Sequence, residues 1–118
     1  MSKSIACIRK GIYSSMLKIA LLEKIRKKSS YSYMLSKEIN KYAKMLGYKN
    51  DIRSSVYNIL ASLEKAGYVK TKRHIVKGKV RNYYTITKKG AVALGDAKKM
   101  LRQTFANAAK DVSKIIAD

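Results

Sequence analysis

The most regular pattern of hydrophobic positions along the chain lies between residues 52 and 63. Apolar side chains recur there every three to four residues, the spacing that places them on one face of an α-helix. They are Ile52, Val56, Ile59, Leu60 and Leu63. Asp51 precedes the run and can accept from the free amides of a first turn, and Gly67 follows where a left-handed C-terminal residue is favoured. The pattern therefore predicts a helix of roughly 14 residues.

Directly after this helix the pattern changes to β-branched and aromatic residues. They form two runs, residues 68–71 and 80–86, with Gly78 between them, which is typical of a β-hairpin. Successive side chains of a strand point to opposite faces. Of the neighbours Tyr83 and Tyr84 we therefore expect one to pack on the core and the other to face outward. A short helix followed by a hairpin is the order found in a winged helix-turn-helix.

Two further helices are predicted before the central one, over residues 11–28 and 31–46. The apolar side of the first is formed by Ile12, Met16, Ile19, Ala20, Leu22 and Ile25. In the second we expect an inward face of Met34, Leu35, Ile39, Tyr42, Ala43 and Leu46. Its outward face would be Ser36, Lys37, Asn40, Lys41 and Lys44. Ser29 and Ser30 offer hydroxyl oxygens to cap the second helix, which ends at Gly47.

A last helix is predicted from Thr87, whose side chain can cap it, almost to residue 118. Its apolar residues repeat at seven-residue spacing, typical of a helix that pairs with another, and Lys98 interrupts the stripe. We expect a dimer interface along this stripe, formed by Leu94, Leu101, Phe105, Ala108, Val112 and Ile115. So small a domain cannot cover so long a helix, which favours a dimer-forming arm. The alternative is that the helix folds back over the first helix and buries its stripe within one chain.

The charge of the chain indicates its partner. The 118 residues suffice for one domain with a modest core, and they carry 27 Lys and Arg against seven Asp and Glu, a formal net charge of +20. Nine of these cations lie between residues 65 and 89, where the sequence has no acid. A hairpin so charged repels itself unless a polyanion lies against it. Nucleic acid is therefore the favoured partner, ahead of an anionic membrane surface or an acidic protein.

Other chemistries find little support in the sequence. Cys7 is the single cysteine and His74 the single histidine, so neither a disulfide nor a metal site is expected. The seven acids are never close in sequence, whereas metal-dependent nucleases gather carboxylates around Mg²⁺. We therefore expect no enzyme and no cofactor. With neither a signal peptide nor a membrane span in the pattern, we expect a cytoplasmic protein associated with the nucleoid.

Three groups of residues are candidates for contact with double-stranded DNA. The first two turns of the central helix can reach base edges, where Arg suits guanine and Asn suits adenine. These residues are Arg53, Ser54, Ser55, Tyr57 and Asn58. The cations around Gly78, which we call the wing cations, can bind phosphates or enter a minor groove. They are Arg73, Lys77, Lys79 and Arg81. Candidates for contact with the DNA backbone are Lys37, Lys88 and Lys89. The alternative for each group is a solvated surface without a partner.

Two stretches of the sequence carry a more specific pattern. They are residues 56–69, VYNILASLEKAGYV, and residues 81–90, RNYYTITKKG. They resemble the Tyr-x-x-Leu-x-x-Leu-Glu-x-x-Gly and Tyr-Tyr-x-Leu-Thr-x-x-Gly patterns of the PadR-like family of winged-helix transcriptional regulators. The resemblance covers residues 16–90, and Ser32 and Tyr33 stand where that family often has Gly-Tyr. MarR-like and ArsR-like regulators share the Leu-Glu-x-x-Gly and hairpin features.

The resemblance implies a homodimer that binds operator DNA, with a C-terminal helix that dimerises and often forms part of an effector pocket. No effector can be named from these residues. The charge is higher than expected for a local regulator, so an archaeal winged-helix chromatin protein is an alternative. A protein that binds structured RNA and a protein-interaction adaptor are two others.

Together these observations predict an α+β, mainly α fold: a winged helix-turn-helix domain with a long C-terminal dimerisation helix. We expect a basic N-terminal segment over residues 1–10, the DNA-binding domain over residues 11–87 and the dimerisation helix over residues 88–118. The predicted partners are double-stranded DNA and a second copy of the chain.

Overall fold

The computed structural model describes the backbone of residues 3–117 and the side-chain surroundings of residues 11, 14–104, 106 and 107. Within that range the chain forms four helices and one three-stranded antiparallel sheet with strand order β1-β3-β2. In chain order the elements are α1 (Lys3–Lys27), β1 (Ser30–Tyr31), α2 (Ser32–Met45), α3 (Arg53–Lys65), β2 (Val69–Val76), β3 (Lys79–Ile86) and α4 (Lys88–Ala117). The predicted α+β, mainly α winged-helix fold is confirmed.

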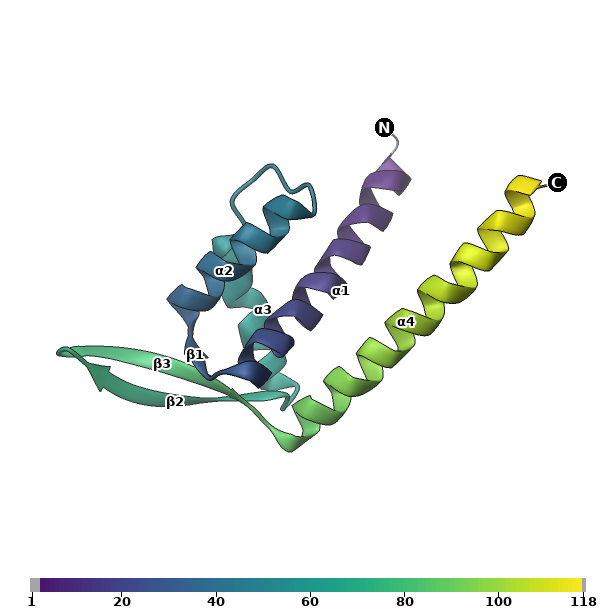
Figure 1. Cartoon of the computed structure of the whole chain (residues 1–118). Helices are drawn as coiled ribbons and strands as arrows, with labels where there is room; N and C mark the ends of the chain where they lie inside the picture. The colour runs from purple at the N-terminus through teal and green to yellow at the C-terminus, as the bar shows by residue number, and fades with distance from the viewer. Residues whose placement is uncertain (1–2, 118) are drawn as a thin grey trace.

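Two parts of the chain project from the helical cluster of α1, α2 and α3. Figure 1 shows the β2–β3 hairpin extending to one side and α4 running as a separate long rod, with its start near the C-terminal end of α1. The radius of gyration is 16.8 Å and the longest dimension 64 Å, whereas a compact domain of this size has a radius of gyration of about 13 Å. The projecting hairpin and α4 account for the difference.

One hydrophobic core joins the first three helices, the base of the hairpin and the start of α4. Its buried side chains are Leu17, Leu21, Leu22, Ile25, Leu35, Ile39, Ala43, Ile52, Val56, Leu60, Leu63, Val69 and Leu94. The face predicted for α3 is confirmed, with Ile59 partly buried beside the core. In α1 the prediction missed Leu17 and Leu21, because apolar residues surround much of that helix and the sequence leaves more than one stripe possible.

Helix α1 begins earlier than predicted. The helix continues back to Lys3, so residues 3–10 extend α1 and are not a separate segment. No proline interrupts this stretch, and a single glycine such as Gly11 is tolerated inside a helix at a cost of about 1 kcal/mol. The composition of residues 1–10 therefore suggested a boundary that the backbone does not have.

The outward face of α2 also differs from the prediction. Ser36 is buried and its hydroxyl donates to the Tyr33 carbonyl at 2.7 Å, whereas Met34 is exposed. Asn40 accepts a hydrogen bond from the Ile52 amide at 3.1 Å. Since Ile52 is the residue before α3, this bond joins α2 to the start of α3. A polar residue that looked solvated therefore fixes the turn of the helix-turn-helix.

Both helix ends predicted from glycine are confirmed. Gly47 and Gly67 have φ values of 96° and 84°, in the left-handed region that glycine adopts without a steric penalty. After Gly67 the Tyr68 amide donates to the Leu63 carbonyl at 3.0 Å, the bond that closes a Schellman motif. The start of α2 contradicts the prediction. Tyr31 precedes that helix without a side-chain cap, and Ser30 instead pairs with Tyr84 in the sheet.

The start of α4 agrees with the prediction. The Thr87 hydroxyl accepts from the Gly90 amide at 3.0 Å and donates to the Gly67 carbonyl at 2.6 Å. The first bond caps the free amides of α4. The second ties that cap to the turn after α3, so one threonine holds two helices and the end of β3 together.

Candidate nucleic-acid interface

The predicted recognition residues lie on the exposed face of α3. Arg53, Ser54, Ser55, Tyr57 and Asn58 are all exposed. Ile52 before the helix and Val56, one turn into it, are buried on the opposite side. The first two turns of α3 therefore present polar side chains and one aromatic ring to the surroundings. This is the arrangement that a helix needs if it is to reach base edges in a major groove.

Arg53 already has an acidic partner within the chain. Its Nε donates to both Asp51 oxygens, at 2.8 and 3.1 Å, and its Nη2 lies 2.6 Å from Oδ2. Asp51 Oδ1 also accepts from the Arg53 amide at 2.9 Å, so the predicted role of Asp51 at the first turn is confirmed. The hydrogen bond to the Arg53 side chain, followed by the bond to its amide, lowers the pKa of Asp51. The guanidinium is thus held in a defined direction at the start of α3.

Aromatic residues extend this surface toward α2. Tyr33 is half exposed at the start of α2, and the Lys37 ammonium lies 5.4 Å from the centroid of its ring. The pKa of Arg53 is raised first by its hydrogen bond to Asp51 and, more weakly, by Tyr33 and Tyr57. These two tyrosines therefore lie near the guanidinium. Lys37, a predicted backbone contact, is exposed on the same side.

The hairpin turns through two residues with positive φ, Lys77 at 51° and Gly78 at 76°. Positive φ at both positions is the signature of a type I′ turn, whose twist matches that of the strands. The register runs from the Val69–Ile86 pair at the base to the Val76–Lys79 pair beside the turn. Val69 is buried, but residues 70–80 are all exposed. The outer part of the hairpin therefore has no packing partner within the chain.

The register divides the hairpin side chains between two faces. Tyr84 packs against the core, and after the effect of burial its pKa is raised by Glu64 and Tyr57, both on α3. The face that carries Tyr84 therefore faces α3, and we call it the α3 face. It carries Thr71, Arg73, Ile75, Val80, Asn82 and Tyr84. The opposite side, which we call the outer face, carries Lys70, Lys72, His74, Val76, Lys79, Arg81, Tyr83 and Thr85.

The four wing cations do not share one face. Arg73 lies on the α3 face, Lys77 lies in the turn, and Lys79 and Arg81 lie on the outer face. Arg81 stacks on the Tyr31 ring, with 4.3 Å between its guanidinium carbon and the ring centroid. Of the neighbours Tyr83 and Tyr84, one packs on the core and one faces away, as predicted. Of the four wing cations, Arg73 is the one that the register places on the α3 face.

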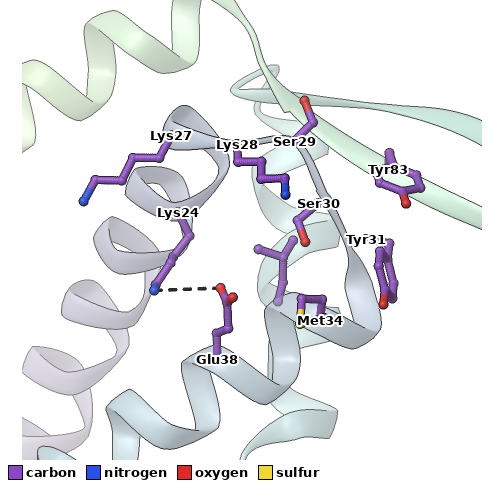
Figure 2. Close-up of a pocket in the computed structure, with 10 residues that line it drawn as sticks. Lys24, Lys27, Lys28, Ser29, Ser30, Tyr31, Met34, Glu38 and Tyr83 are labelled. Carbon is purple, nitrogen blue, oxygen red and sulfur yellow. Dashed lines mark ion pairs between the residues drawn. The ribbon is translucent and has the colours of Figure 1, made fainter.

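A pocket of about 370 Å³ opens on the outer side of the sheet. Figure 2 shows lysines from the end of α1 on one side of it and the rings of Tyr31 and Tyr83 on the other. Those rings are tilted against each other with 5.5 Å between their centroids. The lining residues are Lys24, Lys27, Lys28, Ser29, Ser30, Tyr31, Met34, Leu35, Glu38 and Tyr83. Sequence reasoning missed this pocket, because it forms only when the turn between α1 and α2 folds back and β3 brings Tyr83 against it.

The predicted backbone contacts at the start of α4 differ from each other. Lys88 is exposed. Lys89 donates from Nζ to the Ala66 carbonyl at 2.9 Å, and the same ammonium lies 5.6 Å from the Tyr68 ring centroid. A cation at the C-terminal end of α3 satisfies a free carbonyl and complements the helix dipole. The position of Lys89 therefore has a cause within the fold, and bound phosphate is not needed to explain it.

The predicted dimer stripe of α4 is only partly available to a partner. Leu94 is 1% exposed in the chain's own core, so it is a core residue and we remove it from the interface. Leu101 is partly exposed. The side chains of Phe105, Ala108, Val112 and Ile115 lie outside the described side chains. Lys98, the break in the stripe, forms an ion pair with Glu23 of α1. The first half of α4 thus packs on α1, as the fold-back alternative expected.

Two further features, a metal site and a membrane span, can be compared with the described part of the chain. No three potential metal ligands among His, Cys, Asp and Glu come together in it. None of its helices combines the length and the apolar character that crossing a bilayer requires.

Comparison with known proteins gives a consistent result. The model of the transcriptional regulator PadR-like family matches residues 21–96. A crystal structure of a Streptococcus mutans protein is 27% identical, with a TM-score of 0.67 over 85% of this chain and 89% of that one. The structure of a transcriptional regulator from Clostridium thermocellum is 25% identical, with a TM-score of 0.71 over 85% and 96%.

A PadR-like transcriptional regulator from Bacillus cereus is 24% identical, with a TM-score of 0.61 over 86% of this chain and 92% of that chain. At that identity the likeness concerns the fold. Among curated proteins no match was found.

Proposed function

Because the chain belongs to the transcriptional regulator PadR-like family, we propose that it regulates transcription as a homodimer that binds specific double-stranded DNA sites. The observation that supports this most directly is the exposed polar face of α3 beside a projecting, strongly cationic hairpin. In this proposal α3 enters a major groove. Arg53 and Asn58 read base edges, with Ser54, Ser55 and Tyr57 contacting bases or phosphates.

The hairpin supplies affinity in this proposal. Arg73 and Lys77 reach phosphates beside α3 or enter the neighbouring minor groove, and Lys37 and Lys88 contact the backbone. In a homodimer the two α3 helices address half-sites about 34 Å apart, one turn of the DNA helix. The net charge of +20 draws the protein to DNA of any sequence, so selectivity has to come from α3.

Two sets of variants test whether the hairpin supplies affinity and α3 supplies selectivity. Replacing the four wing cations together by Gln weakens binding to all duplexes, and the slope of log affinity against log salt becomes shallower by about two, because Arg73 and Lys77 contact the duplex held by α3. A matched control removes four exposed cations elsewhere, Lys18, Lys41, Lys99 and Arg102. Its salt slope stays closer to that of the parent. Equal slopes for the two variants would remove the hairpin from the interface.

Selectivity is tested on α3. A preferred site is first selected from a random duplex pool, and Arg53→Ala and Asn58→Ala are then compared on that site and on random DNA. Each variant loses about 1–3 kcal/mol of discrimination at one base position. Equal losses on both DNAs would favour a less specific chromatin protein, the second function that the charge supports. Preference for duplex RNA at matched salt would favour an RNA-binding protein.

A further inference from the structure

A second cationic surface lies on the side of the hairpin that faces away from α3. It combines the last turn of α1 with the outer face of the hairpin, and we call it the outer cationic surface. Its members are Lys24, Lys27, Lys28, Lys70, Lys72, Lys79 and Arg81. The α3 face carries one cation, Arg73. Most of the hairpin's positive charge therefore points away from the proposed recognition helix.

The two parts of this surface are continuous. Tyr83 lines the same pocket as Lys27 and Lys28, on the side opposite the lysines, as Figure 2 shows, and its cross-strand partner on β2 is Lys72. Arg81 stacks on Tyr31 at the edge of the same pocket. The cations at the end of α1 thus connect, through two aromatic rings, with those of the hairpin.

Little within the described part of the chain neutralises this surface. Glu38 is the acid at the pocket, and it lies 3.8 Å from Lys24. Glu23 pairs with Arg26 and Lys98, and Asp51 pairs with Arg53 on the other side of the fold. The C-terminal dipole of α1 favours cations in its last turn, but it does not extend to the hairpin. Lys70, Lys72 and Lys79 have no such explanation.

The dimensions of the surface favour an extended polyanion over a small ligand. An eight-residue strand such as β2 spans about 26 Å, the length of roughly seven base pairs of DNA. A small anion in the pocket would leave the hairpin lysines unused. A nucleic acid backbone can contact both parts at once.

We propose that the outer cationic surface binds the backbone of a second DNA duplex, so that the protein joins two DNA segments. This proposal rests on the proposed function, because it presumes that the α3 side binds the first duplex. The two surfaces lie on opposite sides of one hairpin and can be occupied together. Binding to the second duplex is independent of its sequence, since lysines recognise phosphates and carry no base preference.

The test measures capture of a free labelled duplex by full-length protein bound to an immobilised duplex that contains the selected site. The variant Lys27→Gln/Lys28→Gln/Lys72→Gln keeps the parent affinity for one duplex to within the effect of its charge change. In addition to that effect, its capture of the second duplex falls roughly tenfold, because phosphate contacts of the outer cationic surface are lost. The matched control Lys18→Gln/Lys41→Gln/Lys99→Gln removes the same charge from exposed positions elsewhere and retains capture.

Each other outcome has a definite meaning. If the parent binds one duplex but captures no second, this proposal fails and the proposed function stands. If the parent binds no duplex at all, both fail. Equal capture by the two triple variants would show that joining occurs through the two α3 helices of a dimer, which overturns the outer surface. Preferential capture of duplex RNA, or of neither nucleic acid but of anionic vesicles, would overturn the choice of DNA.

Discussion

Asp51 holds the guanidinium of Arg53 at the start of α3. Both side chains are about half exposed, at 48% and 52%, so the pair adds little to stability in water. In the proposed DNA complex its larger effect would be on recognition, because Asp51 occupies donors of Arg53 that a guanine would need and would place a negative charge beside the DNA. Asp51 therefore orients the Arg53 side chain and at the same time would compete with a DNA base for its donors.

Replacing Asp51 by Asn tests this competition. The amide oxygen of Asn can still accept from the Arg53 amide, while the ion pair is lost. We expect affinity for DNA to rise about five- to tenfold, because the guanidinium is freed and one negative charge is removed. Titration at fixed salt measures it. Asp96→Asn, at an exposed position of α4, makes the same change of charge and is the control. Unchanged or weaker binding by Asp51→Asn would contradict the competition.

Gly90 shows at the residue scale why a family pattern has glycine at that position. An added Cβ would lie 2.0 Å from the Tyr68 carbonyl oxygen, so the first turn of α4 can approach the end of α3 only without a side chain. Gly95, one turn or so later, has nothing within 4 Å of the same added atom. Of the two glycines of α4, only Gly90 thus has a steric reason to lack a side chain.

Thermal unfolding of two alanine variants distinguishes these glycines. Gly90→Ala forces two helices apart and destabilises the fold by about 3 kcal/mol or more. Gly95→Ala removes backbone freedom from an exposed helix position and stabilises by up to about 1 kcal/mol. Similar shifts in melting temperature for the two variants would contradict the close approach at Tyr68.

At the scale of elements, Glu23 connects α1 with α4. It pairs with Arg26 within α1 and with Lys98 of α4, and the side-chain hydrogen bond from Arg26, followed by that from Lys98, lowers its pKa from 4.5 to about 2. A carboxylate whose pKa is lowered by folding stabilises the folded state fully above pH 4.5. That contribution is lost as the pH falls toward 2.

The difference in stability between the parent and Glu23→Gln isolates this effect. We expect the variant to be less stable at pH 7, and the difference to shrink between pH 4.5 and about 2. Melting temperatures across that range measure it. Glu64→Gln removes an exposed carboxylate that forms no ion pair among the described residues and shows a smaller difference. A gap between parent and Glu23→Gln that stays constant with pH would contradict the link.

At the scale of the whole molecule, α4 carries the proposed dimer interface. Its first half packs on α1 through Leu94 and Lys98, and its second half diverges from α1 and projects to the side of the helical cluster, as Figure 1 shows. We propose that a second copy covers this projecting half along the stripe of Leu101, Phe105, Ala108, Val112 and Ile115. A dimer would give two α3 helices a fixed separation, which operator binding requires.

Sedimentation of the Leu101→Asp variant tests whether the second half of α4 forms the dimer interface. A charge in a closely packed helix pair leaves an unpaired group in an apolar interface, so a dimeric parent becomes monomeric. Gln103→Asp, on an exposed position of the same helix, keeps the parent mass. A dimer that survives the change at Leu101 would place the interface elsewhere.

Predictions from the local sequence pattern were correct where one side chain or one backbone angle determines the local structure. The buried face of α3, the left-handed Gly47 and Gly67, the cap at Thr87 and the turn at Gly78 are all confirmed. Prediction failed where a distant segment supplies the partner. Ser36 and Asn40 looked solvated and are hydrogen-bonded, and Lys98 looked like a defect and forms an ion pair.

The sequence by itself determined the order of the four helices and the hairpin, the faces of α3 and the sign of the charge. These depend on periodicity, turn chemistry and composition, which neighbouring residues carry. Only the tertiary structure decided that Arg73 and Arg81 lie on opposite faces of the hairpin and that lysines of α1 join the outer one. The direction of a strand's face is fixed by what packs against it, and here that is α3, through Tyr84.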